Sequence, residues 1–321
     1  MTRKSRSLLY LGIVVFVNLL WAAQYPAYKI ASDALPAATL NFWTFAFALM
    51  VLAPCRFVLQ GRAAPQPAGS RPRNGADALR LVVLGLLGIV PPSVLLAWGI
   101  AKSSAANASI LSLTIPILMS MLAVLMLHER LTWLRVASLS AGLAGTLFLS
   151  SGDLHHLSLD PGMAVGNGVI FLSGLGSAFY NAYSKHLMAR FSELDLLVSS
   201  EAVACVACLG ISLVFDRGAL MGAAHYSPRV WAAMAVLGLI PWGLAMVLWL
   251  FMLSRLDLSQ LSVSIYLLPV FGLTLSVLSL HERIGAAQIL GSALVLTGTA
   301  ALTLVEEAQL RRVGTVEANP S

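Results

Sequence analysis

The stretch LHER at residues 127–130 recurs letter for letter at residues 280–283. A shift of 153 residues superposes the two copies, and eight of the fifteen positions from 116 to 130 are then identical, with Pro116 falling on Pro269. Apolar bias alone matches leucine with leucine, but it does not bring Pro, His, Glu and Arg into register. The recurrence therefore predicts that the chain is built from two related halves.

Weaker matches extend the correspondence toward the start of each half. A shift of 150 aligns Pro91 with Pro241, and a shift of 156 aligns Lys29 with Lys185. The matches follow one another in the same order along both halves. We therefore predict two units, one at residues 1–155 and one at residues 156–321, the second ending in a short cytoplasmic tail.

The composition of the chain is that of a membrane protein. It is 58% hydrophobic and 11% charged, whereas soluble domains have about 45–50% apolar and about 25% charged residues. Ten apolar runs have close to the twenty residues that a helix needs to cross about 30 Å of hydrocarbon. The predicted fold is an all-α polytopic membrane protein with ten transmembrane helices, at residues 8–30, 37–59, 79–100, 104–127, 132–151, 163–187, 195–215, 229–253, 257–280 and 284–304.

The basic residues predict the orientation of these spans. With the N-terminus inside, fifteen of the 20 Lys and Arg residues fall on the cytoplasmic side, as the positive-inside rule requires. Both termini are then cytoplasmic, and the net charge of +6 needs no nucleic acid partner. Because each half contains five spans, equivalent helices cross the membrane in opposite directions. The halves thus form an inverted repeat, an arrangement that lets a carrier open to one side at a time.

At this point the chain resembles the EamA-type family of the drug/metabolite transporter superfamily. The resemblance covers residues 8 to 304 and depends on the turns HERL and HERI, at 128–131 and 281–284, each followed by a Gly-containing apolar helix. It implies a carrier of the bacterial plasma (inner) membrane, since many members export amino acids, other metabolites or toxic compounds through a central cavity. The chain departs from many relatives in its second span, where Leu40-Asn41-Phe42 stands in place of an LRF-like sequence.

Polar and aromatic residues inside the spans are the candidate substrate-binding residues. Polar groups are costly in lipid and normally face a cavity or another helix. The shift of 156 pairs Gln24 with Tyr180 and Tyr25 with Asn181, so the first helix of each half carries such a stripe. The alternatives are helix-to-helix hydrogen bonding for the polar groups and an interfacial belt for Trp98. The candidates are Asn18, Trp21, Gln24, Tyr25, Trp98, Asn107, Ser177, Tyr180, Asn181, Trp242, Gln260 and Ser264.

Two further sets of residues are candidates for moving parts. Prolines within spans remove a helix hydrogen bond and permit a kink, so the pairs Pro91 with Pro241 and Pro116 with Pro269 are candidate hinges or gates, with static bends as the alternative. Glu201 is the acidic residue that lies clearly inside a span, roughly 8 Å below its cytoplasmic end. It is a candidate proton carrier, with a snorkelling or helix-pairing carboxylate as the alternative.

These observations together predict a secondary active transporter, an exporter of small neutral or zwitterionic metabolites such as amino acids, with protons as a candidate coupling ion. Export of lipophilic cationic drugs or toxins is the alternative that the aromatic residues favour. An intramembrane enzyme is the reading we set aside, because HER is not HExxH and no span holds a His midway. Cys205 and Cys208 are interpreted as packing residues, and no metal, cofactor or nucleotide site is predicted. Nothing in the sequence predicts an oligomeric state.

Overall fold

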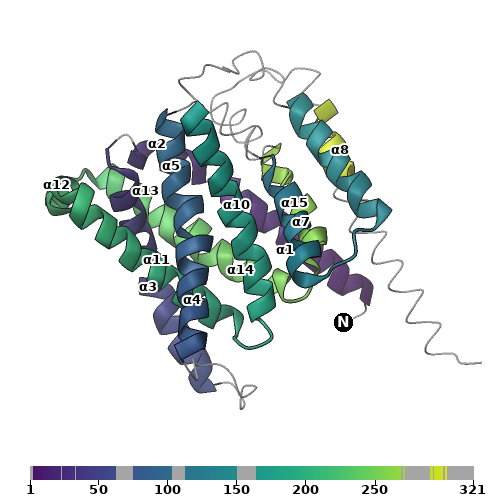
Figure 1. Ribbon diagram of the computed structural model, residues 1–321, viewed down its shortest axis with the longest axis horizontal. Coiled ribbons are helices and arrows are strands. Elements are labelled where there is room, and N and C mark those ends of the chain that lie inside the picture. The colour runs from purple at the N-terminus through teal and green to yellow at the C-terminus, as the bar shows by residue number, and fades with distance from the viewer. Residues whose placement is uncertain are drawn as a thin grey trace, which may run out of the picture.

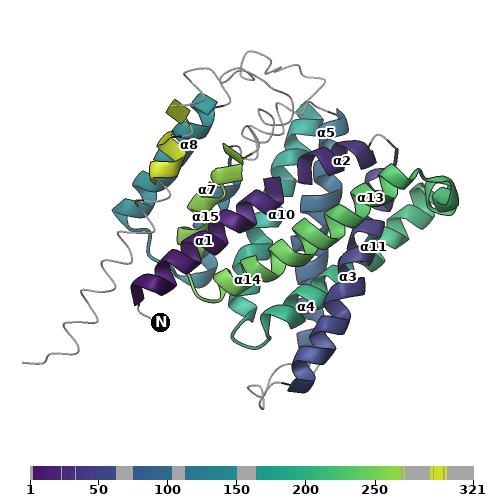
Figure 2. The ribbon, with the colours of Figure 1, turned by 180° about the vertical axis from the view of Figure 1, so that it is seen from behind.

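The computed structural model describes residues 3–22, 24–32, 34–62, 75–102, 113–149, 164–268, 270–271, 290–291, 293–298 and 301. Every regular element in these ranges is a helix (Figures 1 and 2), so the all-α prediction is confirmed. The elements are α1 (Arg3–Ala22), α2 (Gln24–Ser32), α3 (Ala37–Arg62), α4 (Gly75–Gly88), η1 (Pro91–Leu95), α5 (Leu96–Lys102), α7 (Ile115–Leu127), α8 (Trp133–Leu149), α10 (Ala164–Leu187), α11 (Glu193–Phe215), α12 (Arg217–Met221), η3 (Gly222–His225), α13 (Pro228–Leu237), η4 (Gly238–Ala245), α14 (Met246–Leu253) and α15 (Leu258–Ser264).

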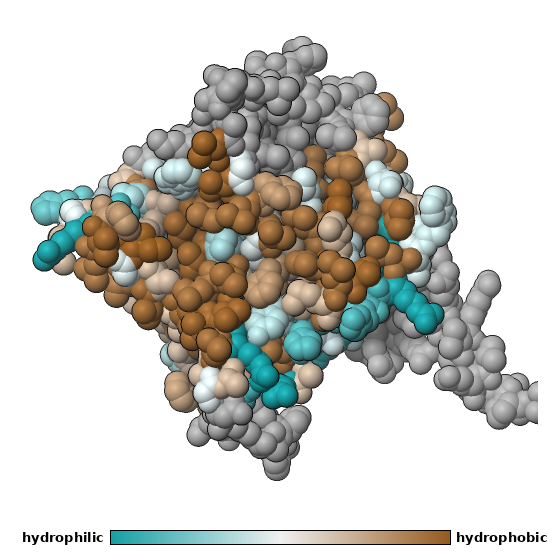
Figure 3. Space-filling model, viewed as in Figure 1, coloured by the Kyte–Doolittle hydropathy of each residue, from teal (hydrophilic) through white to brown (hydrophobic). Residues whose placement is uncertain are grey.

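Four of the described helical stretches are long and apolar enough to cross a membrane. They are Ala37–Val58, Gly75–Gly99, Glu193–Phe215 and Pro228–Leu253, and they coincide with predicted spans two, three, seven and eight. Figure 3 shows a broad hydrophobic band over the molecule, with hydrophilic residues at its lower edge and at the tip that α12 forms. The chain is an integral membrane protein.

Predicted span one holds α1 and α2, and predicted span nine differs in detail from the single helix expected. In span nine, α15 ends at Ser264 and a turn follows at Ile265 and Tyr266, where the Tyr266 amide donates to the Val263 carbonyl at 3.3 Å. Pro116 does not interrupt a helix within the described residues. It lies in the first turn of α7, where a missing N–H breaks no helix hydrogen bond.

Helices α3 and α11 form a long antiparallel pair that is hydrogen-bonded near both ends. At the start of α3, the Thr39 hydroxyl bonds to the Ser212 hydroxyl at 3.2 Å. Near the other end, Arg56 Nε donates to Asp195 at 2.6 Å. Seventeen residues separate Thr39 from Arg56, so these contacts lie about 25 Å apart along the axis. The pair is therefore held by hydroxyl groups at one end and by an ion pair at the other.

Short π-helical segments interrupt spans three and eight at the predicted prolines. Segment η1 begins at Pro91, and Pro241 lies inside η4. In η1 the Ser93 hydroxyl donates to the carbonyl of Ile89 at 2.9 Å, and the same carbonyl accepts from the Ser93 amide at 3.2 Å. π-Helical turns within α-helices are frequent at functional sites. A mobile role for these prolines stays a prediction.

Substituting Gly238 tests the close approach of η4 to α3. A Cβ on Gly238 would lie 2.4 Å from the Thr44 carbonyl oxygen and 2.7 Å from Phe47 Cβ, so Gly238→Ala should force the two helices apart. Overpacking of this kind costs about 1–3 kcal/mol, and we expect a lower melting temperature in detergent. Gly210→Ala is the matched control, since no atom lies within 4 Å of the added Cβ. Equal melting temperatures for the two variants would show that this contact is not tight.

Candidate functional site

A group of neutral polar side chains lies where α1, α10, α14 and α15 meet. The indole N–H of Trp249 on α14 donates to Asn181 Oδ1 on α10 at 2.5 Å, and the Asn181 amide donates in turn to the Ser177 carbonyl at 2.9 Å. Trp21 on α1 packs against Trp249 with ring centroids 4.9 Å apart. Helices α1 and α14 run side by side in Figure 2. These contacts tie the first helices of both halves to one buried tryptophan.

Asn18 and Ser264 add two more polar groups to this cluster. The Asn18 amide donates to the Val14 carbonyl at 2.8 Å and to the Ser264 hydroxyl at 3.4 Å. Its Oδ1 atom is buried and has no hydrogen-bond partner. A buried acceptor without a partner is costly in a folded protein, so this oxygen is available to a ligand donor. We define the polar core as Asn18, Trp21, Asn181, Trp249 and Ser264.

A second polar group lies beside this core, between α2, α3 and η4. Trp242 Nε1 donates to the Tyr28 hydroxyl at 3.1 Å, and that hydroxyl donates to Asn41 Oδ1 at 3.4 Å. Phe45 packs edge-on against Trp242 with centroids 4.9 Å apart. Asn41 thus takes part in a neutral hydrogen-bonded group.

The structure brings some of the sequence candidates together and separates others. Asn18, Trp21, Asn181 and Ser264 meet in the polar core, Ser177 contributes its carbonyl to it, and Trp242 joins Tyr28. Trp98 is 43% exposed and makes no contact with either group. Gln260 is half-buried on α15 and Tyr180 is buried on α10. The side chains of Gln24 and Tyr25, and residues Asn107 and Pro269, lie outside the described residues.

Trp249 is the residue of the core that sequence reasoning did not select. It is 1% exposed and lies in the wholly apolar sequence MVLWLFML of α14. A tryptophan in such a run fits an interfacial belt as well as a buried wall, and only the position of Asn181 opposite it distinguishes the two. The sequence offered no signal for that pairing.

The first LHER stretch forms the turn that ends α7. His128 adopts a left-handed conformation with φ of 54°, and the Glu129 amide donates to the Ala123 carbonyl at 3.1 Å. This is a Schellman-type helix end, in which one residue takes positive φ and the following amide satisfies a free carbonyl of the last turn. The turn points the Glu129 side chain away from α7 and toward the start of α15.

The Glu129 carboxylate caps the N-terminus of α15. It accepts hydrogen bonds from the amides of Leu258 and Ser259 at 2.9 and 3.0 Å, and from the Ser259 hydroxyl at 2.7 Å. An anion is favoured there because the free amides and the helix dipole both present positive charge. Asp257 holds the N-cap position yet makes no side-chain cap, because its carboxylate is bound elsewhere.

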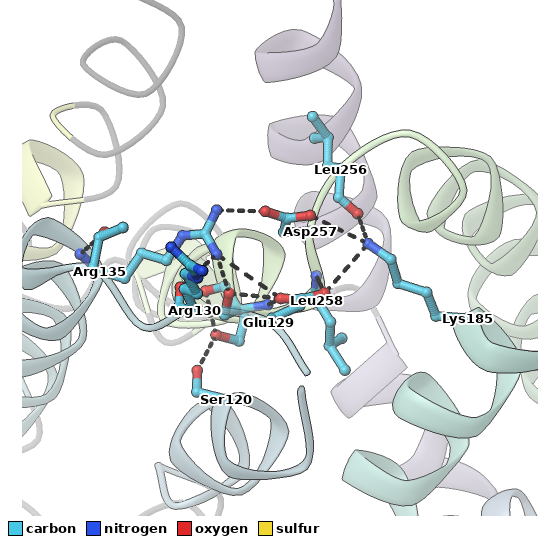
Figure 4. Close-up of polar contacts among 11 residues, drawn as sticks. Ser120, Glu129, Arg130, Arg135, Lys185, Leu256, Asp257 and Leu258 are labelled. Atoms are coloured by element: carbon cyan, nitrogen blue, oxygen red, sulfur yellow. Dashed lines mark hydrogen bonds and ion pairs between the residues drawn. The ribbon is translucent and has the colours of Figure 1, made fainter. Parts of the chain in front are cut away.

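Two basic residues surround this cap, as Figure 4 shows. Arg135 on α8 donates to Asp257 at 2.6 Å and to the Ser259 hydroxyl at 2.7 Å, and lies 3.9 Å from Glu129. Lys185 on α10 lies 3.5 Å from Glu129 and 3.8 Å from Asp257, and donates to the Leu256 carbonyl. We name these four charged residues, Glu129, Arg135, Lys185 and Asp257, the Glu129 network.

The Glu129 network ties the turn after α7, the start of α8 and the end of α10 to the start of α15. The side chains of Glu129 and Arg135 are each 9% exposed, and that of Lys185 is 21% exposed. Charges this shielded interact more strongly than surface pairs. The sequence analysis named Lys185 only in the alignment with Lys29 and missed Arg135 and Asp257. The recurrence of LHER was the feature of the sequence that could have identified Glu129 as a functional residue.

Glu201 lies deeper than its sequence position suggested. Helix α11 begins at Glu193, where Ser192 caps it by accepting from the Asp195 amide. Eight residues of helix therefore precede Glu201, a rise of about 12 Å. The residue is 0% exposed and neither carboxylate oxygen has a hydrogen-bond partner. The side chain is thus buried within the protein, and its role as a proton carrier stays a prediction.

An apolar groove on the outside of the molecule is unrelated to these polar groups. It has a volume of about 440 Å³ and lies between α4 and α11, lined by Val82, Leu86, Ala202, Val203, Val206 and Ala207. Its lining is suited to lipid chains.

The described part of the chain is thus an apolar helical protein with a buried group of neutral polar side chains and a separate network of shielded charges. The chain belongs to the EamA-like transporter family, whose model matches residues 8–151 and 164–304. This finding confirms the family resemblance recognised in the sequence.

Individual relatives are transporters by name. Over 89% of its length the chain is 26% identical to a protein of Streptantibioticus cattleyicolor named "Probable terminal-alkyne amino-acid exporter", covering 90% of that protein. Over 89% of its length it is also 23% identical to "Uncharacterized transporter YoaV" of Bacillus subtilis, covering 93% of that protein. A solved structure entitled "Crystal structure of protein" superposes with a TM-score of 0.75 at 20% identity, over 96% of this chain and 99% of that one. The superposition shows a shared fold.

Proposed function

We propose that this protein is a secondary active transporter of the bacterial plasma membrane that exports small neutral or zwitterionic metabolites such as amino acids. The observation that carries the proposal is the polar core, in which amide, hydroxyl and indole groups from both halves meet. These groups can bond to an ammonium and a carboxylate together, and none of them carries a charge that would favour a charged substrate. The name of the Streptantibioticus relative supports the same substrate class.

The proposed architecture is ten spans in two inverted five-helix repeats, residues 1–155 and 156–321, with both termini cytoplasmic. The contacts of α3 with α11 support it. A shift of 156 carries Thr39 to Asp195 and Arg56 to Ser212, so the pairs Thr39–Ser212 and Arg56–Asp195 exchange with each other, as a twofold axis in the membrane plane requires. The π-helical segments at Pro91 and Pro241 correspond under the shift of 150.

A contact between equivalent residues supports the same axis. The Tyr266 hydroxyl donates to the Leu113 carbonyl at 3.3 Å, and the shift of 153 carries Leu113 to Tyr266. Residues that contact their own counterparts lie on or near a twofold axis. The break in α15 at Ile265 and Tyr266 thus falls near the centre of the molecule, where carriers with inverted repeats place discontinuous helices and substrate sites.

In this topology the Glu129 network lies on the cytoplasmic side and closes the polar core from the cytoplasm. Alternating access then requires that the network separate when substrate enters from inside. Pro91 and Pro241 are the proposed hinges, with η1 and η4 as the irregular segments that would change conformation. Pro116 and Pro269 stay candidates for gates. Each cycle would break and re-form the cap on α15.

Export of lipophilic cations is the second candidate function. The observation that favours it is the aromatic pair Trp21–Trp249 beside the polar core, since tryptophan faces bind organic cations. Binding of a permanent cation at this pair would need no change in the hydrogen bond from Trp249 to Asn181.

Counterflow in proteoliposomes tests the proposal and separates it from the alternative. Vesicles preloaded with unlabelled substrate and diluted into labelled substrate should accumulate label for at least one neutral amino acid, while protein-free vesicles should not. Counterflow of cationic dyes alone would favour the second function. Failure of both panels in protein that remains folded would contradict transport of either class.

A further inference from the structure

Three polar side chains on α10 and α11 are buried together without hydrogen-bond partners. Both oxygens of Glu201, the hydroxyl of Tyr180 and the hydroxyl of Ser184 lack partners, and the residues are 0%, 3% and 0% exposed. Ser184 and Ser200 lie next to the Tyr180 hydroxyl, and Glu201 is close enough to interact with it electrostatically. Most buried polar groups in folded proteins are satisfied. Three unsatisfied ones at one place therefore indicate a site that another state or a ligand completes.

The position of Tyr180 links this group to the polar core. Tyr180 packs directly on α4, where a Cβ on Gly88 would lie 2.9 Å from Tyr180 Cβ. The next residue on α10 is Asn181, whose side chain binds Trp249. Consecutive residues of one helix thus contact the substrate region and the buried carboxyl. A rotation or shift of α10 would change both environments at once.

No described basic residue pairs with Glu201. The titratable groups that face it are Tyr180 on α10 and Cys205 on α11 itself. Two basic residues near α11 are already paired with other carboxylates. Arg56 on α3 is bound to Asp195 at 2.6 Å, and Arg80 on α4 is bound to Asp77 at 2.7 Å. Helix α14 carries no titratable side chain, and Arg217 on α12 lies beyond the far end of α11.

An ionised carboxylate at this place would be buried in an apolar span without a counter-charge or a hydrogen bond, and such groups become neutral instead. Resting on the proposed export function, we propose that Glu201 is the proton-binding site of the transport cycle. It carries a proton on the step that returns the protein from the outward-open to the inward-open state, and in the closed conformation described above. When the network opens, water reaches the carboxyl, the O–H bond breaks, and the proton passes to cytoplasmic water as substrate enters the polar core.

Tyr180 and Ser184 then complete the site in the opened state. Their hydroxyls are donors without acceptors in the closed structure and can bond to the carboxylate once it is ionised. Hydrogen bonds to the charged form stabilise it. Return of the protein to the outward-open state would let Glu201 take up a proton from the outside, so that one proton moves in as substrate moves out.

Infrared spectroscopy of the reconstituted protein tests the protonation state without any substrate. The native protein at neutral pH should show the C=O stretching band of a protonated carboxylic acid, and Glu201→Gln should lose it. Glu193→Gln is the matched control, since Glu193 is 36% exposed at the start of the same helix and pairs with Arg255; it should keep the band. A band that survives in folded Glu201→Gln protein, or that is absent from native protein, would overturn the proposal.

Transport measurements test the coupling. An imposed pH gradient, acid outside, should drive substrate export in the native protein and in Glu193→Gln, and should drive none in Glu201→Gln. Exchange of substrate for substrate at equal pH should persist in all three.

Tyr180→Phe keeps the ring but removes a hydroxyl that can bond to the ionised carboxylate, so it should move the pH midpoint of driven export upward. Driven export by Glu201→Gln, or a native flux that follows a sodium gradient instead, would refute proton binding here. Loss of exchange in native protein would instead count against the proposed function, while the infrared result stands.

Discussion

Glu129→Gln should open the cytoplasmic side of the protein. The substitution removes the charge that Lys185 and Arg135 share, and it leaves these two cations with Asp257 alone. Breaking a buried ion pair by removing one partner costs about 3–5 kcal/mol, and the partial exposure of Lys185 reduces this toward about 2–3 kcal/mol. A change of that size shifts a two-state equilibrium roughly 30- to 150-fold. The closed state should lose population accordingly.

Labelling of a cysteine beneath the network measures this shift. Ser262 is buried and bonds to Ser120 at 2.8 Å, one turn beyond the cap on α15. With Cys55, Cys205 and Cys208 replaced by alanine, Ser262→Cys should react slowly with a membrane-impermeant maleimide from the cytoplasmic side. Adding Glu129→Gln should raise that rate at least tenfold.

The exposed pair of Glu193 and Arg255 supplies the control for this prediction. These residues are 36% and 37% exposed and lie 3.6 Å apart, and surface pairs contribute little. Glu193→Gln should therefore leave the labelling rate within about twofold of its starting value. Lys185→Gln should raise the labelling rate less in protein that already carries Glu129→Gln than in protein with native Glu129. The reason is that the effects of substitutions within one network are not additive. Equal labelling rates with and without Glu129→Gln would contradict the closing role.

Asn181→Ala should weaken substrate binding more than any other single change in the polar core. It removes the acceptor of the Trp249 indole N–H, and an unpaired buried donor costs about 1–3 kcal/mol. It also frees Trp249 to turn away from Trp21. We expect the half-saturating substrate concentration in counterflow to rise at least tenfold, since tenfold corresponds to about 1.4 kcal/mol.

Ser173→Ala is the comparison for this variant. Ser173 is 3% exposed on the same helix, two turns before Asn181. Its replacement removes a buried hydroxyl without touching Trp249, so half-saturation should change less than twofold. An unchanged value for Asn181→Ala, in protein that melts at the native temperature, would place the substrate elsewhere.

The sequence predicted the features that the lipid environment determines better than the features that polar contacts determine. The lipid environment requires long apolar helices, so the bounds of α3, α10 and α11 were predicted within a few residues. The Ser192 cap starts α11 at Glu193, just before the predicted start at residue 195, so Glu201 lies further along the helix than its apolar run implied. Asn18 and Asn181, chosen as candidates from the polar pattern of their helices, both lie in the polar core, and their role in substrate binding stays a prediction.

Contacts between distant segments were beyond the sequence. Trp249 lies in an apolar helix and gives no polar signal, and its role depends on Asn181, 68 residues away. Glu129 was visible as a repeated letter, but its bonds to Leu258 and Ser259 depend on where α15 begins in space. Arg135 resembled an ordinary basic residue near the membrane surface until Asp257 was placed opposite it.

The two ends of the α3–α11 pair differ in chemistry, yet dissolved salt should leave both of them in place. The Arg56 side chain is 20% exposed and that of Asp195 is 2% exposed, and ions screen so shielded a pair far less than they screen a surface pair. The hydroxyl contact of Thr39 with Ser212 involves no full charge. The two helices are therefore expected to stay fastened at both ends when the ionic strength around the protein changes.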